Sequence, residues 1–340
     1  MRFVLITSML VAFFTVIYIT PWLIRYLIRI GLIVKDQNKD GKPLVPISGG
    51  MAVLSGFFTG LMCFIFLTTF FPDGNRLVLD NRVLMFLLSS TISIIMITFV
   101  GFIDDLIIRG DNESSSGLRQ WQKPLLTLAA AIPLMVVNSG VSTLSVPIFG
   151  RVDIGLIYPL IFIPIGVVGA ANMVNMLAGF NGLETGMGII YTGMLGIYAY
   201  FNMEDLFLAE RTSAVIISAV VFSALIAFYI FNMYPARILP GDSLTYLLGG
   251  VLASIAIIGN LEKAALILSI PFLIELILKM RGRFKKQSYG YYLNGKVKSH
   301  YDKIYSLPHI FTKTGRFTEK QIVYFFIILE LIFGGLIWVV

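Results

Sequence analysis

Cysteine, histidine and charged residues are all scarce in this chain of 340 residues, and each shortage excludes a class of protein. Cys63 is the only cysteine and lies within an apolar run, which excludes an internal disulfide and a thiolate metal cluster. His300 and His309 are the only histidines, too few for a metal site built from imidazoles. Charged residues make up 13% and apolar residues 57%, whereas a soluble chain would show amphipathic periodicity. The composition is that of an integral membrane protein.

Long apolar runs recur from one end of the sequence to the other. A bilayer core takes about 20 residues of helix, and the hydropathy pattern predicts ten such spans. They are 3–24, 50–71, 83–102, 123–141, 154–171, 186–201, 213–233, 244–259, 264–279 and 322–340. No small-residue cleavage site follows the first run, so we interpret it as a retained helix. We expect an all-α polytopic protein, a single catalytic membrane domain over 1–340 with one long hydrophilic loop at 280–321.

The 26 Lys and Arg residues are unevenly divided among the loops. Loops that follow odd-numbered spans carry 20 of them, and the remaining loops together with the N-terminus carry 6. The positive-inside rule then places the odd-numbered loops in the cytoplasm and both termini outside, in a protein of the cell (plasma) membrane. Because the basic residues lie between membrane spans, they do not indicate nucleic-acid binding. They fit anionic substrates or lipid headgroups better.

Unusual polar side chains gather where the predicted spans meet this cytoplasmic side. They are Asp104 and Asp105 at the end of span three, Lys123 at the start of span four, Asn172 and Asn175 at the end of span five, and Asp242 at the start of span eight. Asn172 and Asn175 are three residues apart and share one helix face. Gly179 and Gly182 allow a turn that returns Asn181 to the same region. Polar groups at membrane depth are costly unless they line a cavity or meet partners, so this convergence indicates a functional site.

These side chains suit a divalent cation and a diphosphate. Mg²⁺ prefers oxygen ligands and takes one or two from protein, so Asp242 and one asparagine oxygen suffice. Lys123 and the loop arginines are suited to hold phosphate oxygens. Asp104 or Asp105 would orient or deprotonate a nucleophile, but adjacent helix residues point about 100° apart and do not share one task.

Each of these residues also has a purely structural interpretation. Aspartates and asparagines at helix ends face solvent or cap the helix, and Lys123 would anchor a cytoplasmic loop. The basic run K-M-R-G-R-F-K-K at 279–286 is typical of a topology signal or a lipid-surface patch. We expect Glu275, near the end of span nine, to extend its carboxylate to the surface. The functional interpretation depends on all the polar residues meeting at one membrane face.

Four segments carry a family resemblance over nearly the whole chain. They are D-Q-N-K at 36–39 with P-I-S-G-G at 46–50, G-F-I-D-D-L at 101–106, N-M-V-N-M-L-A-G-F-N-G-L-E at 172–184 and F-N-M-Y-P-A-R-I-L-P-G-D-S at 231–243. In the same order they resemble the first loop, the Asp-Asp motif, the asparagine motif and the third motif of the polyprenyl-phosphate N-acetylhexosamine-1-phosphate transferases, which are of the glycosyltransferase family 4 type. The resemblance implies Mg²⁺-dependent transfer of a sugar-1-phosphate from a UDP-sugar to a polyprenyl phosphate, with release of UMP.

The asparagine motif favours one branch of that family. Members that make peptidoglycan precursors carry aspartates there and a histidine-rich last loop, whereas this chain has A-G-F-N at 178–181 and two histidines. It resembles instead the archaeal and eukaryotic branch that uses UDP-N-acetylglucosamine and a dolichol-type lipid phosphate. That resemblance implies the first step of N-glycan lipid assembly.

Carried over by position, the resemblance also implies a role for each motif residue. Asp104 and Asp105 would be catalytic, Asn175 and Asp242 would bind Mg²⁺, Lys123 and Asn172 would lie near the lipid phosphate, and Asp36, Asn38, Lys39, Asn181, Arg281 and Arg283 would bind the nucleotide sugar. Mn²⁺ in place of Mg²⁺ and a homodimer in the lipid bilayer are compatible with the family.

Other functions stay open from the residues alone. A secondary transporter or ion exchanger shares the ten spans and the buried carboxylates, but such proteins usually carry inverted repeats and a site at the bilayer midplane. The sequence shows no internal repeat. A scaffold or channel subunit gives no reason for four polar motifs to converge. Among transferases, another UDP-N-acetylhexosamine for a cell-envelope polymer is the alternative donor.

Overall fold

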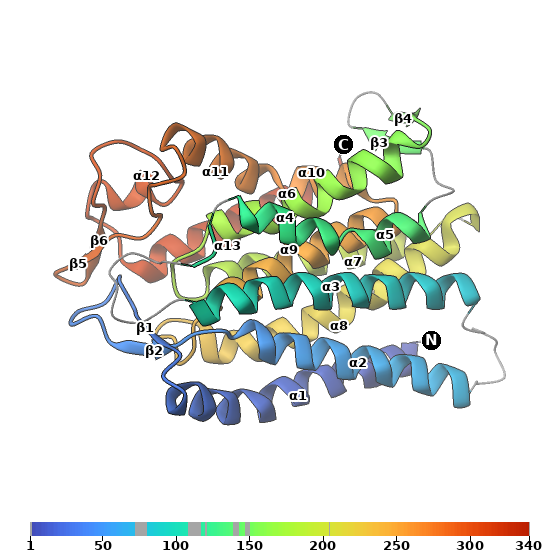
Figure 1. The fold of residues 1–340 in the computed structure, drawn as a ribbon, viewed down its shortest axis with the longest axis horizontal. Coiled ribbons are helices and arrows are strands. Elements are labelled where there is room, and N and C mark those ends of the chain that lie inside the picture. Colours follow the sequence, from blue (N-terminus) through green and yellow to red (C-terminus); the bar gives the residue numbers. More distant parts are fainter. Residues whose placement is uncertain are drawn as a thin grey trace.

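The computed structural model describes residues 2–71, 80–107, 117–119, 121–138, 143–146, 150–203 and 205–339. In these ranges most helices run side by side in one bundle (Figure 1). The longer helices are α1 (Arg2–Arg29), α2 (Gly50–Phe70), α3 (Asn81–Ile107), α6 (Ile163–Met176), α7 (Leu183–Phe201), α8 (Leu208–Asn232), α9 (Gly241–Ile258) and α13 (Glu319–Leu336). The shorter ones are α4 (Gln122–Ala129), α5 (Ile132–Val137), η1 (Tyr158–Phe162), η2 (Asp205–Phe207), α10 (Glu262–Leu268), α11 (Ile270–Arg281) and α12 (His309–Thr312).

Small antiparallel hairpins lie at the two ends of the bundle. They are β1 (Ile33–Lys35) with β2 (Leu44–Pro46), β3 (Thr143–Val146) with β4 (Gly150–Asp153), and β5 (Tyr291–Leu293) with β6 (Lys296–Lys298). The first and third lie at one end, and the second lies toward the opposite end with both chain termini (Figure 1). In the third, Asn294 and Gly295 have φ of 48° and 83°, as a two-residue hairpin turn requires.

Six helical segments are long and apolar enough to cross a membrane. They are Arg2–Arg29, Gly50–Phe70, Asn81–Ile107, Tyr158–Met176, Leu208–Asn232 and Gly241–Ile258. They confirm a mostly helical, multi-pass membrane protein, while the count of ten spans and the sidedness of the termini stay predictions. Two of the other predicted spans are interrupted, since α4 gives way to α5 and α10 to α11. Pro133 and Pro271 lie in the first turns of α5 and α11, where a proline lacks the N–H that would continue the preceding helix.

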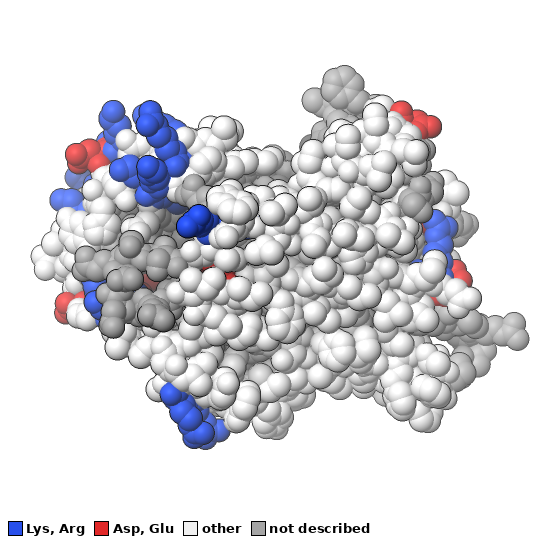
Figure 2. Space-filling view, in the orientation of Figure 1, with Lys and Arg blue, Asp and Glu red and all other residues white. Residues whose placement is uncertain are grey.

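Helix α9 forms the centre of the bundle and α1 part of its outer surface. Every residue of α9 from Ser243 to Ile258 is buried, whereas α1 exposes Phe3 and Tyr18. A Cβ at Gly249 would lie 2.4 Å from the Cα of Ala171, so this glycine lets α9 pack closely against α6. Lys and Arg side chains gather toward the ends of the molecule and leave the face between almost uncharged (Figure 2). The sides of the bundle thus suit lipid.

Candidate active site

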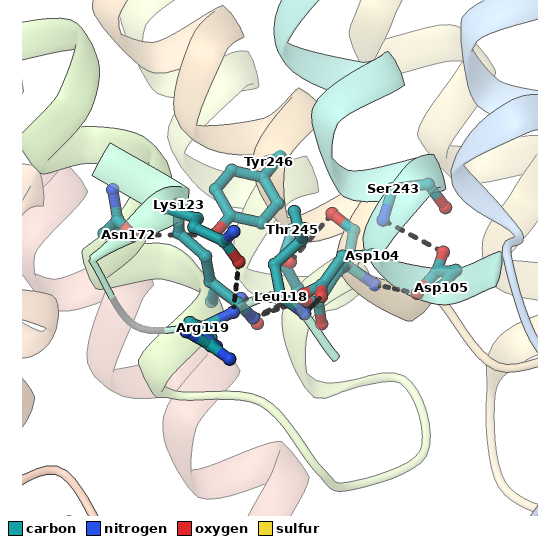
Figure 3. Close-up of polar contacts among 12 residues, drawn as sticks. Asp104, Asp105, Leu118, Arg119, Lys123, Asn172, Ser243, Thr245 and Tyr246 are labelled. Atoms are coloured by element: carbon teal, nitrogen blue, oxygen red, sulfur yellow. Dashed lines mark hydrogen bonds and ion pairs between the residues drawn. The ribbon is translucent and has the colours of Figure 1, made fainter. Parts of the chain in front are cut away.

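The polar ends of α3, α4, α6 and α9 meet at the end of the bundle that carries β1–β2 and β5–β6 (Figures 1 and 3). Helices α3 and α6 run toward this end, and α4 and α9 begin there. The last turns of the first pair therefore lie beside the first turns of the second pair. The structure brings together six of the predicted residues in this way, namely Asp104, Asp105, Lys123, Asn172, Asn175 and Asp242.

Lys123 bridges two carboxylates. Its ammonium forms an ion pair with Asp104 and a second one with Asp242, whose Oδ2 lies 2.9 Å from Nζ. The Nδ2 of Asn175 donates to the same Asp242 oxygen at 3.0 Å. The side chains of Lys123 and Asp242 are 22% and 21% exposed, whereas that of Asp104 is 1% exposed. Lys123 and Asp242 therefore face solvent, and Asp104 lies beneath them.

The neighbours Asp104 and Asp105 point apart (Figure 3). Asp104 accepts the backbone N–H of Leu118, in the segment before α4. Asp105 is completely buried, and its carboxylate accepts hydrogen bonds from the Ser48 hydroxyl at 2.6 Å, the N–H of Asp242 at 2.7 Å and the N–H of Ser243 at 3.1 Å. The two neighbouring aspartates thus contact different groups, and their catalytic roles stay predictions.

Asn172 lies one turn before Asn175, on the side of the cluster next to Tyr246 (Figure 3). Its Nδ2 donates to the Val168 carbonyl at 2.8 Å, within its own helix. The Tyr246 hydroxyl donates to its Oδ1 at 3.5 Å. Asn172 is thus held at the edge of the cluster, with no hydrogen bond to Lys123 or Asp242 among those of the described residues.

A second polar network joins the first loop to the start of α13. Lys39 pairs with Glu319 and, at 3.4 Å, with Asp36, while its ammonium lies 4.3 Å from the centroid of the Tyr234 ring. The Oε1 of Glu319 accepts the backbone N–H of Asn181 at 2.7 Å. The side chains of these four residues are largely shielded from solvent, namely Asp36, Lys39, Asn181 and Glu319. The structure therefore groups predicted nucleotide-sugar residues, but around an acid that the sequence interpretation had missed.

The side chains of Asn38 and Asn181 are bonded within the protein. Asn181 donates to Asp36 at 3.0 Å and accepts the N–H of Ala236 at 3.0 Å. Asn38 donates to the Gly179 carbonyl at 2.7 Å and accepts the N–H of Gly290 at 3.1 Å. These bonds connect the first loop, the asparagine motif, the third motif and the last loop. A cavity of about 230 Å³ adjoins them, lined by Asn38, Tyr234, Tyr292, Gly295, Val297, Thr318, Glu319 and Lys320.

Arg281 and Arg283, also predicted to bind the nucleotide sugar, are exposed at the end of α11. The Arg281 guanidinium lies 6.0 Å from the centroid of the Tyr305 ring. Arg283 has a φ of 53° in the turn that follows the helix. Within the described ranges neither arginine pairs with a carboxylate, and neither joins the Lys123 cluster.

Glu275 organises the last loop, and the expectation that its carboxylate reaches the surface is wrong. The residue is 0% exposed. Its carboxylate accepts the Ser306 hydroxyl and the Leu307 N–H, each at 2.7 Å, and pairs with Lys279 at 3.6 Å. Lys279 in turn donates to Ser288 at 2.7 Å. Donors that return from far along the chain satisfy the carboxylate inside the protein, so it does not need water.

His309 is buried in the same loop and holds one tautomer. The N–H of Tyr305 donates to its Nδ1 at 3.2 Å, so its Nε2 carries the proton and donates to the Gln287 carbonyl at 3.0 Å. Burial lowers the pKa of the imidazole from 6.5 to about 4. His309 is therefore neutral near pH 7 and serves the fold of the loop.

The oxygen atoms of the Lys123 cluster fit Mg²⁺. In the described part of the chain no three His, Cys, Asp or Glu side chains are grouped as a metal site. The cluster offers instead the carboxylates of Asp104 and Asp242 and the carboxamide of Asn175, and Mg²⁺ takes few protein ligands, all of them oxygen. The Asn175 amide presents its NH₂ to Asp242, and a half-turn of the amide presents its oxygen. The assignment of Asn175 and Asp242 as ligands stays a prediction.

Sequence interpretation missed Ser48 and Glu319, which hold the surroundings of the cluster together, and placed the Glu275 carboxylate wrongly. Ser48 lies inside the quoted P-I-S-G-G segment, so its position was available without its partner. Thr318 and Gln321 form a reciprocal cap at the start of α13, a T-x-x-Q spacing that marks a helix start before the predicted span at 322. That signal would have placed Glu319 in the first turn of a helix.

A bundle of apolar helices with an oxygen-rich, ion-paired cluster at one end defines a polytopic membrane protein with a built polar site. Residues 85–260 match the family described as glycosyl transferase family 4. The chain is 34% identical to proteins of Saccharolobus solfataricus and Sulfolobus acidocaldarius, over 97% of its length and 94% of theirs. Both are provisionally named UDP-N-acetylglucosamine–dolichyl-phosphate N-acetylglucosaminephosphotransferase. A phospho-N-acetylmuramoyl-pentapeptide-transferase of Halalkalibacterium halodurans is 29% identical over 81% of each chain. The protein belongs to glycosyl transferase family 4.

Proposed function

We propose that this protein transfers N-acetylglucosamine-1-phosphate from UDP-N-acetylglucosamine to dolichyl phosphate or another polyprenyl phosphate and releases UMP. The names of the two archaeal relatives, similar over 97% of the chain, support this donor and acceptor. The observation that carries the proposal is the cluster of Lys123, Asp104, Asp242 and Asn175, which sets an ammonium beside hard oxygen donors. The product would be the first lipid-linked intermediate of N-glycan assembly.

In the proposed reaction, an oxygen of the lipid phosphate attacks the phosphorus that carries the sugar. The bond from that phosphorus to the UMP oxygen breaks, and UMP leaves with the bonding electrons. Lys123, with Asn172 near it, would hold the lipid phosphate beside Asp242, and Asp104 would orient the ammonium from below. A phosphate monoester is largely ionised near neutral pH, with a second pKa of about 6, so no strong base is needed. Mg²⁺, when bound by Asn175 and Asp242, would stabilise the charge that develops on the diphosphate.

The nucleotide sugar would approach from the side of the first and last loops. Arg281 and Arg283 are exposed there and are suited to grip diphosphate oxygens through their guanidinium forks. Asp36, Lys39 and Asn181 are bonded to protein groups, so we assign them, with Asn38, to the wall that shapes this side of the site.

The position of the cluster suits one soluble and one lipid substrate. It lies where α3 and α6 end and α4 and α9 begin, at one end of the bundle (Figure 1). A polyprenyl phosphate would keep its chain in the bilayer beside the apolar helices and its phosphate near this end. The excess of basic residues, 20 against 6, in the loops on this side supports a cytoplasmic active site in the plasma membrane, with both termini outside.

The proposal is tested by UMP release. Purified protein is incubated with a panel of UDP-sugars, a polyprenyl phosphate and Mg²⁺, and we expect lipid-dependent UMP with UDP-N-acetylglucosamine and its loss on chelation of Mg²⁺. Asp242→Ala and Asn175→Ala should each lower kcat/KM by roughly 100-fold or more. Asp302→Ala, an exposed carboxylate of the last loop, is the matched control. If no sugar gives lipid-dependent UMP, the protein is not such a transferase.

Assays on the same purified protein distinguish the proposed function from two alternatives. The relatives named phospho-N-acetylmuramoyl-pentapeptide-transferase support a different UDP-N-acetylhexosamine donor, which the sugar panel tests directly. A secondary transporter would move a solute across proteoliposomes without UMP release. The placement of the polar cluster at one end of the bundle, rather than near its middle, disfavours that class (Figure 1).

A further inference from the structure

We propose that Asp105 is a positioning residue that holds Asp242 in place by capping α9 from the neighbouring helix α3. The inference goes beyond the roles that the resemblance implies, since Asp105 would touch neither substrate. Its functional half rests on the proposed transferase activity, whereas its structural half does not.

Helix α9 lacks a cap of its own. The residue before its first turn is Pro240, whose side chain has no hydrogen-bonding group. The first N–H groups of a helix have no partner within the helix, and buried ones need one from elsewhere. Asp105 supplies it, since Oδ1 accepts the N–H of Asp242 at 2.7 Å and Oδ2 accepts that of Ser243 at 3.1 Å. A carboxylate at this end also complements the helix dipole.

The capping carboxylate is confined on every side. A Cβ at Gly241, where φ is 71°, would lie 2.4 Å from Asp105 Oδ2, so the backbone of α9 lies directly against the carboxylate. One turn earlier in α3, a Cβ at Gly101 would lie 2.3 Å from the Asp242 carbonyl oxygen. The Ser48 hydroxyl closes the remaining side at 2.6 Å. Asp105 is 0% exposed, so a substrate would reach it only after α3 and α9 separate.

Asp104, the neighbour of Asp105, makes no hydrogen bond to the backbone of α9 among those of the described residues. Asp104 pairs with Lys123 and accepts from Leu118, and both partners lie before or within α4. A change from carboxylate to amide at either aspartate removes the same charge. Only the change at Asp105 places an NH₂ group against the N–H donors of α9. Asp104→Asn is therefore a matched control for Asp105→Asn.

Hydrogen–deuterium exchange, resolved to single residues in the metal-free protein without substrate, tests the structural half. We expect Asp105→Asn to speed exchange at the amides of Asp242 and Ser243 by about tenfold, the usual effect of a lost cap. Exchange in the later turns of α9 should not change, and Asp104→Asn should leave the two amides as in the wild type. Equal exchange in wild type and Asp105→Asn overturns the proposal.

If Asp105→Asn does not fold, hydrogen exchange of the wild-type protein alone tests the structural half of the proposal. The amides of Asp242 and Ser243 should then exchange at least tenfold more slowly than those of an unstructured peptide of the same sequence. Unprotected amides overturn the proposal, whatever the enzymatic activity.

Kinetics test the functional half. A displaced Asp242 should lower kcat by roughly 100-fold in Asp105→Asn while KM for each substrate changes less than threefold. The pH profile of kcat should keep its shape, since a positioning residue moves no proton in the reaction. Loss of the acid limb of that profile, with the two amides still protected, would make Asp105 a proton acceptor and overturn the proposal. Absence of UMP release by the wild type contradicts the transferase function and leaves the exchange result standing.

Discussion

Lys123→Met removes the ammonium that bridges Asp104 and Asp242 while keeping most of the volume of the side chain. Asp104, 1% exposed, then loses its counter-ion inside the protein, and two carboxylates face each other without a positive charge. We expect the variant to be less stable than the wild type, and more strongly stabilised by added Mg²⁺.

The magnitude follows from how deeply each partner is buried. Breaking a fully buried ion pair costs about 3–5 kcal/mol, because a charge is left without compensation. Solvent screens part of this loss here, since the Lys123 and Asp242 side chains are 22% and 21% exposed, and we expect about 2–3 kcal/mol. At roughly 2 °C per kcal/mol for a chain of this size, the unfolding midpoint should fall by about 5 °C.

The assay is thermal unfolding in detergent, followed by tryptophan fluorescence, with and without Mg²⁺. Lys303→Met, which neutralises an exposed lysine of the last loop, should change the midpoint by less than about 1 °C. In an Asp104→Asn background, Lys123→Met should cost at least about 1 kcal/mol less than in the wild type. An unchanged midpoint, or equal losses in both backgrounds, refutes the argument that Lys123 compensates Asp104.

Three further changes probe groups outside this cluster. Glu330 of α13 is 0% exposed, and among the described residues neither of its carboxyl oxygens has a hydrogen-bond partner. Glu330→Met should therefore raise the free energy of unfolding by about 1–3 kcal/mol and with it the unfolding midpoint. A lower midpoint contradicts this reasoning. Glu275→Ala leaves the Leu307 N–H and the buried Lys279 ammonium without their partner, so trypsin should cut after Arg281, Arg283 and Lys285, which are exposed, faster than in the wild type. Equal digestion rates would mean that other contacts hold the loop. The lowered pKa of His309 means that the unfolded chain binds more protons between pH 6.5 and about 4. The wild type should therefore lose up to ~3 kcal/mol as pH falls through that window, and His309→Gln should lose less.

The convergence of Asp104, Lys123, Asn175 and Asp242 could be predicted because a polar residue at the border of a long apolar run stands out in the sequence. Each residue lies where an apolar run begins or ends, and the alternation of spans assigns those borders to one side of the membrane. The structure places all four in contact. Their roles as catalyst and metal ligands stay predictions, which the variants above address.

What the sequence does not contain is the partner of each polar group. Nothing local to Asp105 shows that it faces Ser243 rather than the solvent-facing cluster, because the packing of α3 on α9 decides this. The same holds for Glu275, whose donors lie 31 and 32 residues further along the chain. The interruption between α10 and α11 was also missed, because mean hydropathy does not register the missing N–H of Pro271.

The pairing of Lys39 with Glu319 has a consequence for the order in which the chain is assembled during synthesis. The two residues are 280 positions apart. At about 5–20 residues per second, a ribosome needs roughly 14–56 s to reach the second after the first. During that interval the first loop is already synthesised, but Lys39 has not yet met the Glu319 carboxylate. The backbone N–H of Asn181, made later, lacks the same partner. The polar network around Glu319 is therefore completed last, when α13 emerges. A nascent chain that stalls before α13 would hold the Lys123 cluster but lack this network beside it.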